Sequence, residues 1–232
     1  MNIYFISGIG ADHRMFTYLQ LPEGPVPSHI HWIPPYKDES LSDYSRRLEQ
    51  QIDTSRPFIL VGLSLGGIMA VEIAKRHTPL CTIIISSIPL ATHLPKYFRI
   101  GHKWRLAKFI PATALKIASI LKQRVTLRSP YKRKLVRDIT WSSDSQFIKW
   151  AVPAVLDWKN ATIPTPFYHI HGSWDEVFPI HLTTPTHVVP RAGHMLLISH
   201  PQAVNHILHE ILPPYFQDAK PDTRIPKADD RA

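Results

Sequence analysis

Ser64 lies at the centre of the sequence Gly62-Leu63-Ser64-Leu65-Gly66, a glycine-flanked setting in which a serine can act as a nucleophile. The apolar run at residues 58–61 predicts a strand buried on both faces, and the small and apolar residues after Gly66 predict a helix. A turn this sharp between strand and helix strains its central residue and leaves no room for side chains two positions away, which accounts for the two glycines. We therefore predict that the Ser64 hydroxyl points out above the sheet, with the N–H of Leu65 close to a developing oxyanion.

Two further reactive side chains follow predicted strands near the other end of the chain. Asp175 comes shortly after the apolar run 167–171, and His194 comes shortly after the apolar run 186–189. A serine hydroxyl needs a base to accept its proton, and an imidazole needs an acceptor that fixes its tautomer. We predict that Ser64, His194 and Asp175 are the nucleophile, the base and the orienting carboxylate of an acyl-transfer site.

With each of these residues just past a strand, in the order Ser, Asp, His, the chain resembles the α/β-hydrolase superfamily. The motifs that carry the resemblance are Ser7-Gly8-Ile9-Gly10, Gly62–Gly66, His171-Gly172 with Asp175 and Pro179, and Gly193-His194. The resemblance covers residues 1–90 and 160–212. It implies that the backbone N–H of Ile9 is the second oxyanion donor beside that of Leu65.

Other carboxylates are weaker candidates for the orienting acid. The superfamily sometimes places this acid after the strand predicted at residues 82–87, but the sequence there, Ser86-Ser87-Ile88-Pro89, has no carboxylate. Glu176 is the alternative to Asp175, and we expect Asp12 to cap a helix over residues 13–20. Only residues 176–185 separate Asp175 from the next strand, so the helix in this crossover has one or two turns or is absent.

The predicted fold is α/β: a mainly parallel sheet of about six strands flanked by helices, with a helical lid inserted, as in the α/β-hydrolase fold. The predicted strands are residues 2–7, 29–33, 58–61, 82–87, 167–171 and 186–189. Further helices are expected from residue 41 and over residues 201–212. We divide the chain into a hydrolase core (1–89 and 161–212), a lid (90–160) and a disordered tail (213–232).

Within the lid, the apolar spacing predicts a helix over residues 103–123 with a break or kink at Pro111, and a second helix over residues 143–156 with a break near Pro153. We expect these helices to lie over Ser64. Their aromatic and aliphatic residues would then shape an acyl pocket.

The composition is that of an ordinary globular chain of 232 residues with 44% hydrophobic residues. The single cysteine, Cys81, lies in an apolar run, which predicts a buried residue. No leader and no apolar run long enough to span a bilayer is present, so we expect a soluble, cytoplasmic protein. The histidine pairs 169/171 and 206/209 lack a third ligand, so we predict no metal and no cofactor.

The positive charge is concentrated in one segment. Residues 90–137 contain thirteen Lys or Arg and no Asp or Glu, whereas the rest of the chain carries 14 of the 27 basic residues and all 18 acidic ones. Such a segment suits an anionic membrane surface or an anionic substrate, and a merely solvated basic face is the alternative. With no recognition motif in the segment, we do not expect specific binding of nucleic acid.

The nucleophile defines the reaction. A serine forms an acyl-enzyme, which predicts hydrolysis of a small-molecule ester or thioester, in the manner of carboxylesterases, lipases or thioesterases. Hydrolysis of a carbon–carbon bond or acyl transfer to an alcohol would use the same triad, and a binding protein that has lost turnover is a further alternative.

Overall fold

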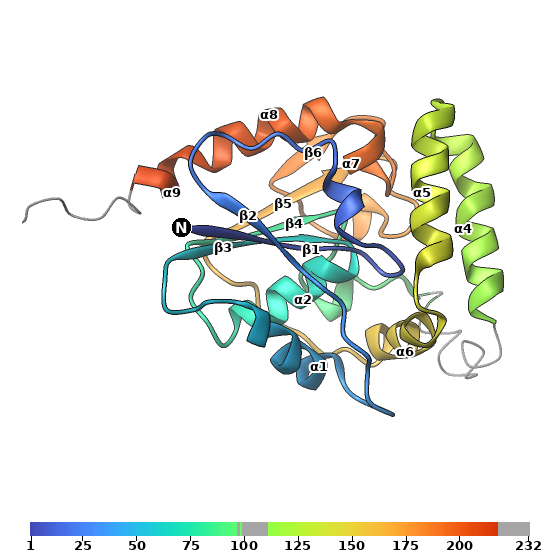
Figure 1. Cartoon of the computed structure of the whole chain (residues 1–232), viewed down its shortest axis with the longest axis horizontal. Coiled ribbons are helices and arrows are strands. Elements are labelled where there is room, and N and C mark those ends of the chain that lie inside the picture. The colour runs from blue at the N-terminus through green and yellow to red at the C-terminus, as the bar shows by residue number, and fades with distance from the viewer. Residues whose placement is uncertain (97, 99–110, 218–232) are drawn as a thin grey trace, which may run out of the picture.

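A six-stranded, fully parallel sheet organises the chain (Figure 1). The structure, a computed structural model, describes residues 1–96, 98 and 111–217. Its strands are β1 (Asn2–Ile6), β2 (Val26–Ile30), β3 (Phe58–Leu63), β4 (Cys81–Ile85), β5 (Phe167–Gly172) and β6 (His187–Val189), in the spatial order β2-β1-β3-β4-β5-β6. The predicted α/β-hydrolase fold class is confirmed by this sheet and its flanking helices.

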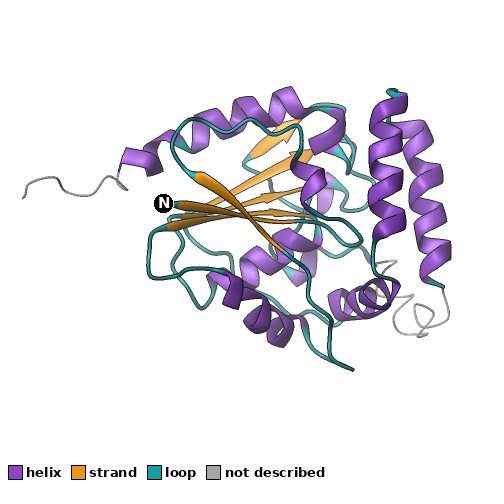
Figure 2. Cartoon of the chain, viewed as in Figure 1, coloured by secondary structure: helices purple, strands orange, loops and turns teal. Residues whose placement is uncertain are grey.

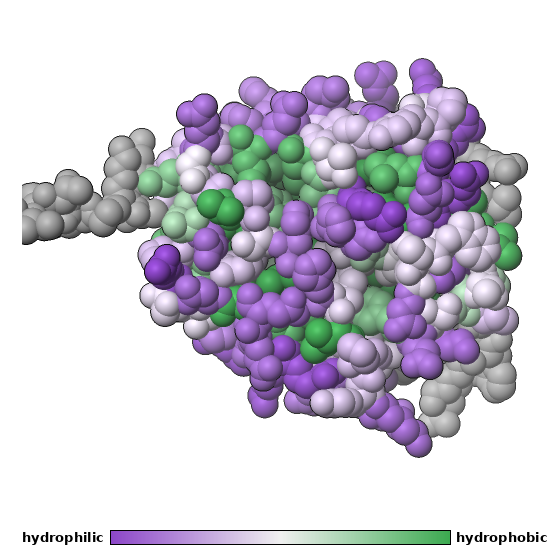
Figure 3. Space-filling view, viewed as in Figure 1, coloured by the Kyte–Doolittle hydropathy of each residue, from purple (hydrophilic) through white to green (hydrophobic). Residues whose placement is uncertain are grey.

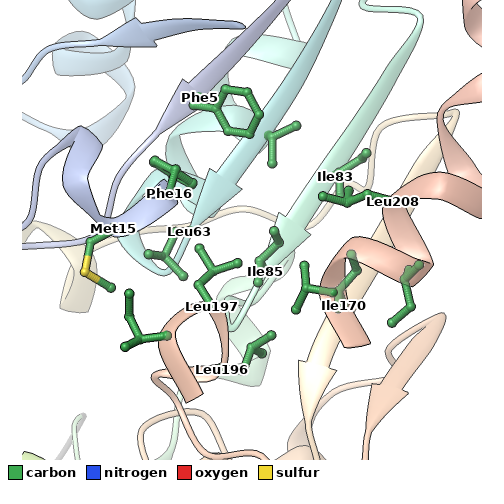
Figure 4. Packing of buried hydrophobic residues seen from close by; sticks show 14 of the residues in the cluster. Phe5, Met15, Phe16, Leu63, Ile83, Ile85, Ile170, Leu196, Leu197 and Leu208 are labelled. Carbon is green, nitrogen blue, oxygen red and sulfur yellow. The ribbon is translucent and has the colours of Figure 1, made fainter. Parts of the chain in front are cut away.

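The central strands are buried at every position because helices cover both faces of the sheet (Figure 2). One face packs against η1 (His13–Phe16), α7 (Leu196–Ser199) and α8 (Pro201–Ile211). Figure 4 shows this core, where Phe16 of η1, Leu197 of α7 and Leu208 of α8 meet side chains of the strands. The continuous apolar sequence of β3 and β4 is what two buried faces require.

The other face of the sheet packs against α1 (Leu41–Leu48), which η2 (Glu49–Gln51) extends, and α2 (Leu65–Ala74). On the view in Figure 3, hydrophilic residues cover most of the outer surface, with smaller apolar patches between them. Within the described residues, no helix has the length and apolar composition needed to cross a bilayer.

Within the described residues, three α-helices inserted between β4 and β5 lie beyond the carboxyl ends of the strands (Figure 1). They are α4 (Ala112–Thr126), α5 (Pro130–Ser142) and α6 (Ser145–Leu156). Val136 and Ile139 of α5 join the core on one face of the sheet, and Phe147 of α6 joins the core on the other. The short helices that complete the described part of the chain are η3 (Ala91–His93), η5 (Ile180–Leu182) and α9 (Pro213–Gln217).

Several element boundaries differ from those predicted. Strand β2 begins three residues earlier than expected, at Val26, because the edge of a sheet tolerates Pro27, which has no N–H to donate. The helix expected over residues 13–20 is the single turn η1, after which the Thr17 hydroxyl donates to the carbonyl of Arg14. Residues 213–217, expected to be disordered, form α9; residues 218–232 of the predicted tail lie outside the described residues.

The helices inserted between β4 and β5 also differ from those predicted. Residues 103–110 of the predicted helix lie outside the described residues, and α4 begins directly after Pro111. Pro153 does not end α6, because the N–H of Asp157 donates to the Pro153 carbonyl (3.0 Å) and closes a further turn. Helix α5 was not predicted, although Ser129 at its N-cap and Pro130 at its first position are a start signal.

Candidate active site

The turn between β3 and α2 holds Ser64 at a positive φ (φ 52°, ψ −117°), which is strained for a residue with a side chain. Two hydrogen bonds fix the strained residue: its N–H donates to the Ile85 carbonyl (2.9 Å), and its carbonyl accepts from the Ser87 hydroxyl (2.7 Å). A Cβ on Gly66 would overlap the Ile6 carbonyl, and one on Gly62 would overlap the Gly66 carbonyl. Glycine is therefore required on both sides of the serine.

The structure brings the three predicted side chains into one hydrogen-bonded chain. Nε2 of His194 lies 3.0 Å from Ser64 Oγ, and Nδ1 of His194 lies 3.1 and 3.0 Å from the two carboxylate oxygens of Asp175. Because a carboxylate only accepts, Nδ1 carries the proton and the lone pair of Nε2 faces the hydroxyl. This is the tautomer in which an imidazole can take the proton of Ser64.

The carboxylate of Asp175 is fully buried and ionised. Burial alone would raise the pKa of Asp175, but the imidazole of His194 and the backbone N–H of Phe178 lower this pKa below its ordinary value. The N–H groups of Val177 and Phe178 both donate to Oδ1 at 2.9 Å. These bonds fix the carboxylate against the ring of His194.

The alternative carboxylates have other partners. Oε2 of Glu176 accepts from the backbone N–H of His194 (3.1 Å), so this side chain holds the loop of His194. Asp12 caps η1, as expected for its cap role, and forms an ion pair with Arg14. Arg14 in turn donates to the hydroxyl of Ser142 (2.6 Å), which ties η1 to the end of α5.

The two predicted oxyanion donors lie beside Ser64. Leu65 is the first residue of α2, and Ile9 lies in the turn after β1; both line the same cavity as Ser64. Among the described residues, neither N–H is used in a hydrogen bond. The turn is close to the nucleophile, since a Cβ added to Gly8 would lie 3.3 Å from Ser64 Cβ.

A pair of buried histidines on β5 lies behind Asp175. Nε2 of His171 is 2.8 Å from the Phe178 carbonyl, and its Nδ1 is 2.9 Å from Nε2 of His169. A carbonyl only accepts, so Nε2 of His171 carries a proton and Nδ1 accepts from His169. From the sequence, these two histidines were considered only as a metal-binding pair without a third ligand. Their hydrogen bonds were not predicted, because the bond to Phe178 depends on how the following loop folds back.

A cavity of about 300 Å³ lies over Ser64 and His194, bounded by the inserted helices. Its lining is apolar apart from the reactive pair and the hydroxyls of Ser119 and Thr140. No Lys, Arg, Asp or Glu of the described residues lines it. Besides Ile9 and Ala11, the apolar side chains come from both cores and from the insertion: Met15, Leu63, Leu65, Ile68, Leu94, Phe98, Val136, Ile139, Val152, Val155, Leu156, Val177, Phe178 and Met195.

Two of the described cations of the insertion make contacts away from the cavity. Lys116 is buried, and its ammonium donates to the carbonyls of Ser143 (2.5 Å) and Trp141 (3.3 Å) at the end of α5. Lys132 lies over the ring of Tyr18, 5.1 Å from its centroid. In the described part of the chain, no three His, Cys, Asp or Glu side chains are grouped to hold a metal ion.

Comparisons with known proteins agree with the fold. The model of the alpha/beta hydrolase family matches residues 3–207, whereas no curated protein sequence matches significantly. Among solved structures, MenH from S. aureus is similar at 16% identity over 94% of each chain, with a TM-score of 0.72. A thermophilic esterase from Thermogutta terrifontis (15% identity, 94% of this chain and 90% of that one) has a TM-score of 0.68. A carboxylesterase structure from the thaumarchaeon Nitrososphaera gargenis (18% identity, 94% of this chain and 91% of that one) has a TM-score of 0.67. Since the family model spans most of its length, the chain belongs to the alpha/beta hydrolase family.

Proposed function

We propose that the protein is a serine hydrolase that cleaves a carboxylic ester or thioester through an acyl-enzyme intermediate. The observation that carries this proposal is the position of His194, which lies within hydrogen-bond distance of Ser64 Oγ on one side and of both Asp175 oxygens on the other. In this proposal Ser64 is the nucleophile, His194 the general base and Asp175 the carboxylate that orients it.

The reaction would proceed in two half-reactions. Oγ of Ser64 attacks the substrate carbonyl while Nε2 of His194 takes the hydroxyl proton, and the N–H groups of Leu65 and Ile9 bind the oxyanion of the tetrahedral intermediate. His194 then gives this proton to the leaving alcohol or thiol as the bond to the acyl carbon breaks. A water molecule then attacks the acyl carbon while Nε2 of His194 takes one of its protons. The bond between the acyl carbon and Oγ breaks, His194 returns the proton to Oγ of Ser64, and the carboxylic acid is released.

The apolar lining of the cavity favours an uncharged, apolar acyl group as the part of the substrate that lies over Ser64. Its volume of about 300 Å³ is at the lower end of the range for small-molecule pockets, and burying a carboxylate against its apolar lining would be costly. An anionic part of a substrate would therefore lie outside the cavity. The similar structures from esterases support an ester as the bond that is cleaved.

Labelling with a fluorophosphonate tests the nucleophile. We expect one label per chain, on Ser64, with none in Ser64→Ala and much less in His194→Ala. Turnover of a p-nitrophenyl ester should fall by about 10⁶ in kcat in Ser64→Ala, as it does when other triad enzymes lose their serine. A label on any other serine, or activity retained in Ser64→Ala, would show that the mechanism is wrong.

A panel of p-nitrophenyl esters with graded acyl chains tests the substrate class. We expect kcat/KM to rise with chain length until the cavity is filled and then to fall, and to be low for an acyl chain ending in a carboxylate. If the carboxylated chain is turned over as well as the neutral one of equal length, the assignment of an uncharged acyl group is wrong. An acyltransferase would instead form a new ester when an alcohol is added.

A further inference from the structure

The turn that carries Ile9 is defined by its own hydrogen bond. The N–H of Ala11 donates to the Gly8 carbonyl (3.1 Å), so Ile9 and Gly10 are the central residues of a β-turn. Gly10 has φ +65°, the positive value that a type II turn requires at this position. The Gly8–Ile9 peptide of this turn borders the cavity next to Ser64.

One side chain from the far edge of the sheet binds both ends of this turn. Nε1 of Trp32, which follows β2, donates to the carbonyls of Gly8 (3.3 Å) and Ala11 (3.1 Å) in a three-centre hydrogen bond. The Ser7 hydroxyl adds a bond to the Ala11 carbonyl (2.8 Å). The Gly8 carbonyl therefore accepts from both Ala11 and Trp32.

A peptide group is planar, so a donor that fixes its carbonyl also fixes the direction of its N–H. The carbonyl of Gly8 and the N–H of Ile9 belong to one peptide group and point in opposite directions. A bond to the carbonyl also polarises the group and makes the N–H a stronger donor. We propose that Trp32 is a positioning residue of the oxyanion site: its indole N–H holds and polarises the Gly8–Ile9 peptide so that the Ile9 N–H faces the oxyanion. This inference rests on the proposed function.

The indole is itself held in place by the inserted helix α6. Its ring lies 4.8 Å from the ring of Phe147 and 6.2 Å from that of Tyr44, measured between centroids. The donor is therefore fixed by packing before any substrate binds. Such preorganisation is what makes an oxyanion site effective, because no reorganisation is needed during the reaction.

The same aromatic cluster contains a matched control, Trp150. Its ring packs against Tyr44 (4.3 Å) and Phe147 (5.5 Å), it is half-buried like Trp32, and its indole N–H donates to a backbone carbonyl, that of Glu39 (2.8 Å). Trp32→Phe and Trp150→Phe each remove one indole N–H from this cluster. Only the first removes a hydrogen bond to the oxyanion turn.

We expect Trp32→Phe to lower kcat for a p-nitrophenyl ester about tenfold with KM within twofold, less than the 10²–10³ lost when an oxyanion donor is removed outright. Trp150→Phe should stay within twofold of the wild type in both constants. A trifluoromethyl ketone, which forms an oxyanion with the serine, should bind about tenfold more weakly to Trp32→Phe. The matching secondary alcohol, which forms no oxyanion, should bind equally well to the wild type, Trp32→Phe and Trp150→Phe.

Incorporation of 3-benzothienylalanine at position 32 keeps the bicyclic ring and removes only the N–H, so it serves as a second variant should Trp32→Phe fold poorly. Equal losses at positions 32 and 150, or parallel losses of ketone and alcohol binding, would overturn the inference. With Ser64 still labelled by a fluorophosphonate, such a result would leave the proposed function standing. Absence of the label from Ser64 in the wild type would instead refute the proposed function.

Discussion

Asp175 and Glu176 are adjacent carboxylates with different partners on the same residue. Asp175 binds the imidazole of His194, and Glu176 binds its backbone N–H. The first contact sets the tautomer of the ring and stabilises its charged form, whereas the second sets only the path of the loop. The two side chains should therefore differ sharply when each is replaced by its amide.

We expect Asp175→Asn to fold normally and to lose on the order of 10⁴ in kcat, because an amide at this position favours the wrong tautomer of His194. Glu176→Gln keeps an oxygen that can accept the N–H of His194, so its kcat should stay within about tenfold of the wild type. Steady-state kinetics with a p-nitrophenyl ester measure both. A larger loss in Glu176→Gln than in Asp175→Asn would move the acid role to Glu176.

Site residues that belong to a local sequence motif could be predicted from the sequence. A residue that reaches the site only through contacts formed on folding could not. Ser64, Asp175 and His194 were each recognisable because they follow an apolar run in a set order. Trp32 gave no such signal, because its contact with Gly8 and Ala11 exists only once two neighbouring strands have paired. Its role depends on register, which a single local pattern does not encode.

At the scale of elements, β5 combines an apolar strand with two buried histidines. Burial lowers the pKa of His169 to about 3, and burial likewise lowers that of His171. Both rings are therefore neutral in the folded protein at neutral pH. In the unfolded chain a histidine takes up a proton near pH 6.5, so the unfolded state binds more protons than the folded state below that pH.

The free energy of unfolding should accordingly fall as the pH is lowered from 6.5 to 4.5. Above pH 6.5, His169 should make no contribution to the pH dependence of this free energy. In His169→Gln the side chain can still donate to His171 but cannot be protonated. In this variant the slope of the free energy of unfolding against pH should therefore be smaller, by up to the roughly 1.4 kcal/mol per pH unit that corresponds to one proton. Urea unfolding at several pH values measures the slope, with His206→Gln on the exposed face of α8 as the control. Equal slopes in wild type and His169→Gln would contradict the prediction.

Elements with a strong internal pattern were predictable, whereas those determined by a neighbouring surface were not. The β3–α2 unit was found because a buried strand and a glycine-flanked serine occur together. Helix α5 is rich in Lys and Arg, and its apolar stripe is short: Val136 and Ile139 are buried only because the sheet core lies beside them. Its polar composition therefore masked a helix that tertiary packing stabilises.

For the whole molecule, the dominant feature is the separation of charge between the basic segment 90–137 and the slightly acidic remainder. The described cations do not line the cavity, and the outer part of α5 also carries Tyr131 and Trp141, which are 71% and 51% exposed. Cations with exposed aromatic residues are typical of surfaces that meet the headgroups of anionic lipids. Peripheral binding to an anionic membrane through this segment stays a prediction.

We expect the protein to be retained on vesicles containing phosphatidylserine and not on phosphatidylcholine alone, with retention falling as salt is added. Replacing Arg128, Arg133 and Lys134 together by glutamine should weaken retention roughly 100-fold, at about 1 kcal/mol per cation. Turnover of a small neutral ester should be unchanged.

A second triple variant has the same net charge and serves as the control. It replaces three cations outside the segment, Lys37, Arg46 and Lys159, by glutamine. Equal weakening in the two triple variants would show that net charge alone, and not this surface, governs the association.

The aromatic contact between Trp32 and Phe147 has a consequence for how such a protein can diversify. Phe147 lies on the helix that forms one wall of the cavity, so a substitution that shifts α6 as a whole changes both the fit of the acyl group and the support of the oxyanion turn. Val136 and Ile139, on the opposite wall, belong to the cluster on the other face of the sheet. Over evolutionary time, or in a directed-evolution experiment, new acyl preferences should therefore accumulate first on α5, while α6 changes slowly along with the reaction that it supports.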